Sequence, residues 1–165
     1  KASSIKIQRE NNEQYQVRLQ QLFDILFLLA LTVAVIVTFG GGLLINIFFG
    51  EQYEASAGIL VVHIWAAIFI FMRALFSRWI LMEDALVFSL ITQGFGAVVN
   101  VILNYFWIQE YGALGAAYAT LLSYAASSYI ALLLYKKTRP VFWMMCKSIV
   151  MYSLFSKGIK NEKVS

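Results

Sequence analysis

Charged residues are scarce in this 165-residue sequence. They make up 13% of the chain, whereas 61% is hydrophobic, and the mean hydropathy is +0.72. A soluble domain typically carries roughly 25% charged and 45–50% apolar residues. The composition therefore excludes an ordinary soluble protein. It predicts an all-α integral membrane protein, because a helix satisfies its own backbone hydrogen bonds within a bilayer.

Residues that commonly carry catalysis are also scarce. Cys146 is the only cysteine, which excludes an intrachain disulfide and a cysteine metal cluster. His63 is the only histidine, so histidine-pair metal sites and most acid–base dyads are excluded as well. We expect no cofactor and no enzyme activity, since the spans hold neither an acidic pair nor a nucleophile arrangement. His63 is then either a hydrogen-bonded packing residue or a proton carrier.

Long apolar runs predict four transmembrane helices, at 22–49, 57–81, 85–108 and 113–135. Each run exceeds the roughly 20 residues that cross a bilayer as a helix. Residues 1–21 form a polar lead-in, and residues 136–165 form a basic tail. The apolar part of that tail, 141–155, is short for a span and suits a helix in the interface, with Trp143 and Tyr152 as aromatic anchors.

The third run is free of charge but carries a polar stripe. The stripe residues recur at helical spacing and are Gln93, Gly96, Ala97, Asn100 and Asn104. Lipid offers amides no hydrogen-bond partners, so this stripe faces other helices or a watery cavity. Either the amides hold helices together or they line the cavity.

Two arginines lie within the second run. If the helix continues to residue 81, Arg73 lies about 9 residues, or about 13 Å, from the turn at 82–84. Ionisable groups at such depth usually face protein or a cavity. Alternatively, Arg73 and Arg78 extend their side chains to the interface.

Small residues predict close packing at two places. Three consecutive glycines, at 40–42, favour a kink or a hinge near the end of the first run. A stripe on the fourth run is typical of helix backbones in close approach within a membrane. Its members are Gly112, Ala116, Ala119, Ser123 and Ser127.

The distribution of basic residues predicts the orientation. The connections at 50–56 and 109–112 contain acidic residues and neither lysine nor arginine, whereas all 13 basic residues lie before the first run, near the second turn or after the fourth run. Basic residues mark the cytoplasmic side. Both ends are therefore expected inside the cell, and the net charge of +4 indicates orientation rather than nucleic-acid binding.

Four short segments resemble the carboxyl-terminal part of bacterial flippases for O-antigen and other lipid-linked oligosaccharides, which belong to the superfamily of the multidrug and toxin exporters (MATE). The segments are 49–55 (FGEQYEA), 77–81 (SRWIL), 99–104 (VNVILN) and 111–120 (YGALGAAYAT). One departure is that Gln109 and Glu110 stand where these flippases usually carry a proline before the tyrosine-glycine turn.

The resemblance implies a two-lobe transporter of the inner membrane, with this chain supplying its last four helices. Because the chain begins at Lys1, we expect further helices of the same transporter or of a partner chain. The implied activity is alternating-access transfer of an undecaprenyl-pyrophosphate-linked oligosaccharide. In such a transporter Arg73 and Arg78 would attract the pyrophosphate. Gln93, Asn100 and Asn104 would bind sugar hydroxyls or hold the helices in register.

Two other functions remain open. A cation-coupled exporter of small drugs would need a buried carboxylate, and Asp24, at one end of the first run, is the only candidate within the four runs. A membrane assembly subunit without transport activity would need only the packing surfaces.

Overall fold

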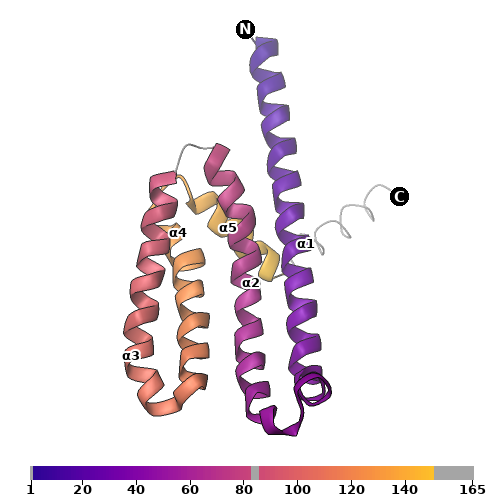
Figure 1. Ribbon diagram of the computed structural model, residues 1–165. Coiled ribbons are helices and arrows are strands. Elements are labelled where there is room, and N and C mark those ends of the chain that lie inside the picture. Colours follow the sequence, from indigo (N-terminus) through magenta and orange to yellow (C-terminus); the bar gives the residue numbers. More distant parts are fainter. Residues whose placement is uncertain (1, 83–85, 151–165) are drawn as a thin grey trace, which may run out of the picture.

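The described part of the protein is almost entirely helical, as the sequence predicts. The computed structural model describes residues 2–82 and 86–150, with side chains from 12 to 80 and from 86 to 150. Within these ranges the chain forms helices joined by short turns (Figure 1). The turn at 83–85, Tyr152 and the end of the expected interfacial helix lie outside the described residues.

Helix α1, Ala2–Phe49, includes both the polar lead-in and the first apolar run. The change from polar to apolar sequence does not end the helix, because no proline or turn residue separates the two parts. Its last turns change direction near the three glycines but stay helical (Figure 1). Gly41 is buried there, with the side chains of Leu60 and Val61 packed beside it.

A tight turn connects α1 to the second helix. Gly50 adopts a φ of 91°, a left-handed conformation that glycine tolerates better than any other residue. A short 3-10 helix, η1, Glu51–Tyr53, follows directly, and α2 then runs from Glu54 to Met82. The connection is short enough to place α1 and α2 side by side and antiparallel (Figure 1).

Helix α3, Leu86–Ala125, contains a reversal of direction at Gly112, where φ is 58° and ψ is −135°. The chain descends before this glycine and ascends after it, so the two parts form an antiparallel hairpin (Figure 1). We call 86–111 the first leg of the hairpin and 113–134 the return leg. The return leg continues through a π-helical turn, η2, Ala126–Ile130, into α4, Ala131–Leu134.

Three helical stretches are long and apolar enough to cross a membrane: Asn12–Phe49, Glu51–Ile80 and Leu86–Leu134. The third stretch contains the reversal at Gly112 and so contributes two legs. Three stretches with one internal hairpin are compatible with the four predicted spans, whose boundaries stay a prediction.

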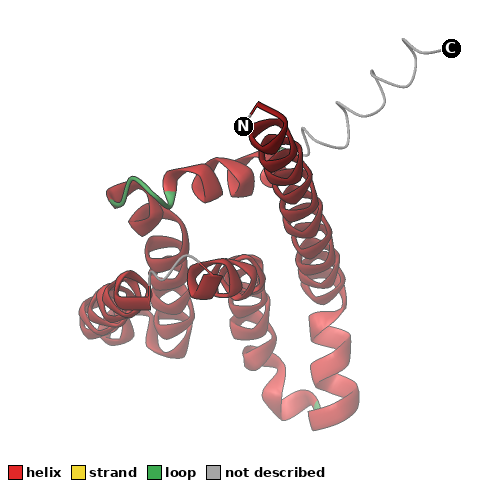
Figure 2. Ribbon diagram, turned by 90° about the horizontal axis from the view of Figure 1, so that it is seen from above, coloured by secondary structure: helices red, strands yellow, loops and turns green. Residues whose placement is uncertain are grey.

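Helix α5, Arg139–Ile149, lies across one end of the bundle and reaches back to α1 (Figures 1 and 2). It begins with Pro140 in its first turn, where the missing N–H of proline costs nothing. One side of the helix is buried, through Val141, Met145 and Ser148. Trp143 and Lys147 are exposed on the other side, an amphipathic pattern that suits the predicted interfacial position.

The hydrophobic core is concentrated at the same end of the molecule. Its members are contributed by α1, α2, the end of the return leg and α5. They include Phe23, Phe27, Met72, Phe76, Trp79, Tyr129, Leu132, Val141 and Met145. Many apolar side chains elsewhere on α1 and on the first leg are exposed, as expected for surfaces that face lipid or further helices.

Candidate functional site

Arg73 is the centre of a polar cluster between α2 and the hairpin. Its Nη2 donates to the carbonyl and the hydroxyl of Ser89, both at 3.1 Å, and to Oγ1 of Thr92 at 3.0 Å. Its Nη1 donates to the carbonyl of Ser127 at 3.1 Å. The guanidinium therefore connects α2 with both legs of the hairpin.

The partners of Arg73 are all neutral. Arg73 is half-buried, and within the described residues its hydrogen bonds go only to carbonyl and hydroxyl oxygens. The ring of Phe76 lies on one side, 5.3 Å from the guanidinium carbon. Neutral acceptors and an aromatic face stabilise a cation without cancelling its charge. The position of Arg73 therefore favours an incoming anion.

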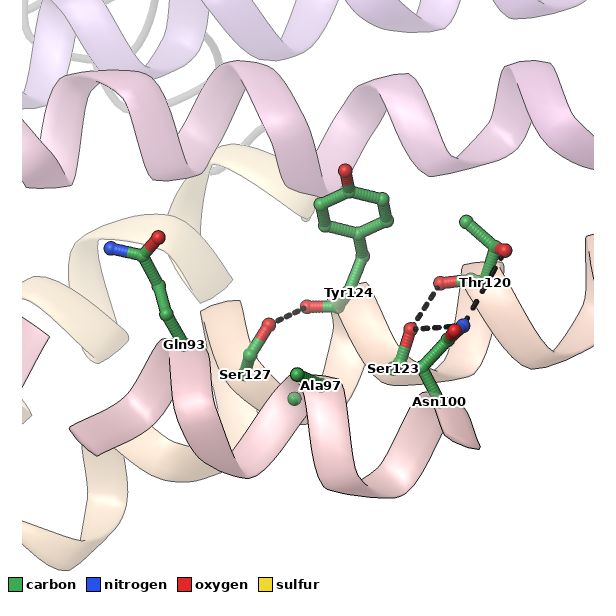
Figure 3. Close-up of a pocket in the computed structure, with 8 residues that line it drawn as sticks. Gln93, Ala97, Asn100, Thr120, Ser123, Tyr124 and Ser127 are labelled. Atoms are coloured by element: carbon green, nitrogen blue, oxygen red, sulfur yellow. Dashed lines mark hydrogen bonds between the residues drawn. The ribbon is translucent and has the colours of Figure 1, made fainter. Parts of the chain in front are cut away.

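A polar groove runs along the hairpin next to this cluster (Figure 3). It has a volume of about 290 Å³ and is lined from both legs. The lining residues are Gln93, Gly96, Ala97, Asn100, Thr120, Ser123, Tyr124 and Ser127. Ser127 belongs to both features, because its carbonyl binds Arg73 while its side chain lines the groove.

Close approach of the two legs depends on Gly96. A Cβ at this position would lie 2.6 Å from Cβ of Ser127, which is too close for any side chain. The absence of a side chain at Gly96 lets the first leg pack directly on the return leg. The predicted stripe of small residues is buried at Ala119, Ser123 and Ser127, whereas Gly112 is exposed at the reversal.

Asn100 and Asn104 hydrogen-bond within the hairpin. The Nδ2 of Asn100 donates to Oγ of Ser123 at 3.2 Å and to Oγ1 of Thr120 at 3.5 Å (Figure 3). The Nδ2 of Asn104 donates to Oδ1 of Asn100 at 2.9 Å. Asn100 thus does both things that the sequence left open: it holds the legs together and it lines the groove.

The remaining predicted site residues are more exposed. Gln93 is exposed at the rim of the groove, where its Nε2 donates to Oγ of Ser89 at 3.3 Å. Arg78 and His63 are also exposed on α2, and neither has a hydrogen bond within the described residues. The structure therefore places Gln93 beside the Arg73 cluster through Ser89, and Gln93 and Asn100 in the groove lining. Asn104 is connected to the groove only through Asn100, and Arg78 and His63 lie outside both features.

A second polar cluster joins α1 to α5. Asp24 is buried, and its Oδ1 accepts hydrogen bonds from Oγ of Ser148 at 2.6 Å and from Nε2 of Gln20 at 2.9 Å. The same amide nitrogen of Gln20 lies 2.9 Å from Oγ of Ser148 and 3.1 Å from the carbonyl of Met144. This network attaches α5 to α1.

Several residues of both clusters were not predicted from the sequence. Ser89 and Thr92 lie on the same helical face as Gln93 and Gly96, one turn earlier. Extending the polar stripe by that turn would have identified them. Ser148 and Gln20 offer no such pattern, because they are separated by 128 positions in the sequence.

The described helices are long and apolar enough to span a membrane, and Arg73 with the polar groove beside it is an arrangement compatible with a helical membrane transporter. The family model described as "Lipid II flippase MurJ" matches residues 2–159, nearly the whole sequence. The chain therefore belongs to the lipid II flippase MurJ family. Searches of curated proteins and of solved structures returned no significant match.

Family membership confirms part of the expectation from sequence. The protein is a multi-pass membrane protein of a flippase family, hence a transporter rather than an enzyme. Its family is that of a flippase for a lipid-linked precursor, in line with the resemblance to lipid-linked oligosaccharide flippases. The family description names lipid II and not O-antigen.

Proposed function

We propose that this chain lines part of the path by which a flippase moves the polar head of an undecaprenyl-diphosphate-linked oligosaccharide from the inner to the outer leaflet. The observation that carries the proposal is the position of Arg73, a cation within a predicted span, bonded to neutral oxygens beside a polar groove. Such a residue in a membrane helix is a functional-site candidate by default.

The two parts of the site match the two parts of the substrate head. A diphosphate is an anion, and the planar guanidinium of arginine binds phosphate oxygens through two parallel N–H groups. Sugar hydroxyls need donors and acceptors of hydrogen bonds, which Gln93, Asn100 and Thr120 offer along the groove. The polyprenyl chain would stay in the bilayer beside the apolar outer faces.

The saccharide is the part of the substrate on which the family and the motif resemblance differ. Lipid II is the substrate named for the family, whereas the motifs at 49–55 and 111–120 resemble O-antigen and polysaccharide flippases. The two substrate types share the diphosphate and differ in the sugars. We therefore assign the shared diphosphate to Arg73 and the saccharide to the groove. The transport assay described below identifies which saccharide is carried.

The orientation follows from the basic residues. We place the chain in the inner membrane with four spans, with α5 and both ends on the cytoplasmic side and with the turns at Gly50 and Gly112 outside. In this orientation Arg73 lies in the cytoplasmic half of the membrane, where a substrate would enter. The partners are the bilayer, the lipid-linked oligosaccharide and the other helices of the transporter.

The cation-coupled exporter is less well supported. It requires a carboxylate that faces the transport path, and Asp24 is the only carboxylate within the four predicted spans. Its Oδ1 accepts hydrogen bonds from Gln20 and from Ser148 of α5, whereas the groove lies in the α3 hairpin.

An assembly subunit would use Arg73 only to hold helices together, and substitutions separate this role from anion binding. Arg73→Lys keeps the charge, whereas Arg73→Gln keeps hydrogen-bond donors and removes the charge. We expect transport of a fluorescent lipid-linked oligosaccharide in proteoliposomes to survive in part in R73K and to fall by about tenfold or more in R73Q. Arg18→Ala, which removes an exposed arginine on α1, is the matched control and should leave transport unchanged.

Equal transport by R73Q and the unaltered protein, at equal amounts of folded protein, would show that Arg73 only holds helices together. Running the assay with lipid II and with an O-antigen type of oligosaccharide identifies the saccharide. Transport of neither lipid would contradict the proposed function as a whole.

A further inference from the structure

The return leg of the hairpin contains an irregular turn at the level of Arg73. Residues 126–130 form the π-helical turn η2, whereas the helix on either side is regular. A π-helical turn is rare and frequently marks a functional site. In a transmembrane helix it is a place where the direction of the segment beyond it can change.

Two buried hydroxyls in η2 have no hydrogen-bond partner within the described residues: Oγ of Ser128 and the phenol of Tyr129. Their side chains are 1% and 9% exposed. A buried polar group without a partner is costly, and in a native structure it points to strain or to a second state that satisfies it. The Tyr129 ring lies between Phe69 of α2 and Phe142 of α5, at centroid distances of 5.7 and 5.9 Å.

Arg73 is bonded to this turn. Its Nη1 donates to the carbonyl of Ser127 in η2, while Nη2 is bonded to Ser89 and Thr92 of the first leg. Phosphate oxygens are charged and accept hydrogen bonds from a guanidinium about twice as strongly as a neutral carbonyl does. A diphosphate in the groove would therefore compete directly with the carbonyl of Ser127.

We propose that η2 is a hinge which Arg73 holds in its π-helical form and which the substrate diphosphate releases. When phosphate oxygens take over Nη1, the turn converts toward a regular α-helix. In a regular helix a serine hydroxyl can bond to the carbonyl four residues earlier, which gives Ser128 a partner. The conversion rotates the end of the return leg, with Tyr129, relative to α2 and α5. This inference rests on the proposed function of Arg73.

The direct test is a distance measurement across the hinge. Spin labels on Leu122 and Leu134, which are both exposed, bracket η2. Labels on Leu90 and Ile102, separated by the same number of residues in the regular first leg, form the control pair. The measurement is pulsed electron paramagnetic resonance on the intact transporter in nanodiscs, with and without undecaprenyl diphosphate. We expect the distance between residues 122 and 134 to change on binding and that between 90 and 102 to stay constant.

Two variants support this test. R73Q should show the changed distance without any lipid, because the bond to Ser127 is weakened. Tyr129→Phe keeps the ring and removes an unpartnered hydroxyl, so it should favour the π-helical form. Because the lipid must then convert a more stable π-helical form, we expect Y129F to bind undecaprenyl diphosphate and to transport it about fivefold less well than the unaltered protein.

The outcomes separate the two proposals. If undecaprenyl diphosphate binds through Arg73 and the distance between residues 122 and 134 is constant, the hinge is wrong while the proposed function stands. Normal transport by Y129F would contradict the hinge in the same way. If the lipid does not bind, or binds equally to R73Q, both proposals fail.

Discussion

The guanidinium of Arg73 and the backbone carbonyl of Ser127, 54 positions apart in the sequence, are joined by a hydrogen bond of 3.1 Å. This bond connects Arg73 of α2 with the hairpin. Ser127 also lines the polar groove. In the proposed mechanism this bond couples substrate binding to the shape of the hairpin.

The close contact of the hairpin legs gives a clear stability prediction. Gly96→Ala places a Cβ against Ser127 and should force the legs apart, at a cost of about 1–3 kcal/mol of overpacking. Gly94→Ala is the matched control, since the space around Gly94 is open and alanine is the better helix former. Thermal unfolding in detergent should show a lower midpoint for G96A and an equal or higher midpoint for G94A. Equal midpoints in both variants would refute the close approach.

Asn100 should contribute to stability as well as to binding. Asn100→Ala removes the bond to Ser123 and leaves the amide of Asn104 without its acceptor. Interhelical hydrogen bonds in membranes are worth about 0.6 kcal/mol on average, so the loss of stability should be modest. Asn46→Ala, an exposed amide on α1, is the control. If the transport rate of N100A falls only in proportion to its loss of folded protein, Asn100 has a packing role alone.

The attachment of α5 to α1 predicts a local effect. Ser148→Ala removes the hydroxyl that donates to Asp24 and accepts from Gln20, which costs about 1–3 kcal/mol for the groups left unsatisfied. We expect faster hydrogen exchange of the α5 amides in S148A, with the hairpin amides unchanged. Lys147→Ala, which changes the neighbouring exposed residue, is the control: its α5 amides should exchange at the same rate as those of the unaltered protein. Unchanged exchange in S148A would show that apolar packing alone holds α5.

The predicted orientation can be tested by cysteine labelling in whole cells. In a Cys146→Ser background, a membrane-impermeant maleimide should label Gln52→Cys and leave Lys136→Cys unlabelled until the membrane is permeabilised. Cys146 is replaced so that the introduced cysteine is the only target, although burial raises the pKa of its thiol and so lowers the fraction of reactive thiolate. Labelling of K136C in intact cells would show that the chain has the opposite orientation in the membrane.

The helices and the polar stripe were predictable because each depends on residues close in sequence. Long apolar runs predict helices by length alone, and the spacing of Gln93, Gly96 and Asn100 places them on one face without any knowledge of the fold. The reversal at Gly112 lies in the predicted connection. The polar lead-in is compatible with either a helix or a linker, so its continuation into α1 does not follow from the sequence.

The partners of the charged residues were not predictable, since they depend on contacts between distant segments. The sequence placed Arg73 within a span but gave no reason to select Ser89, Thr92 and the carbonyl of Ser127 as its partners. The sequence does not predict the π-helical turn either, because alanine, serine and isoleucine also occur in regular helices. Ser127 was expected only as a packing residue, and its second role comes from its carbonyl, which every residue has.

The measurement that tests the central claim most directly is equilibrium binding of undecaprenyl diphosphate to the intact transporter in nanodiscs. The neutral alcohol undecaprenol serves as the matched lipid, and R73K and R73Q serve as the matched variants. We predict that the diphosphate binds much more tightly than the alcohol, that R73Q loses this preference by about tenfold or more, and that R73K retains part of it. Equal preference for the diphosphate in R73Q and the unaltered protein would contradict the claim that Arg73 binds the substrate.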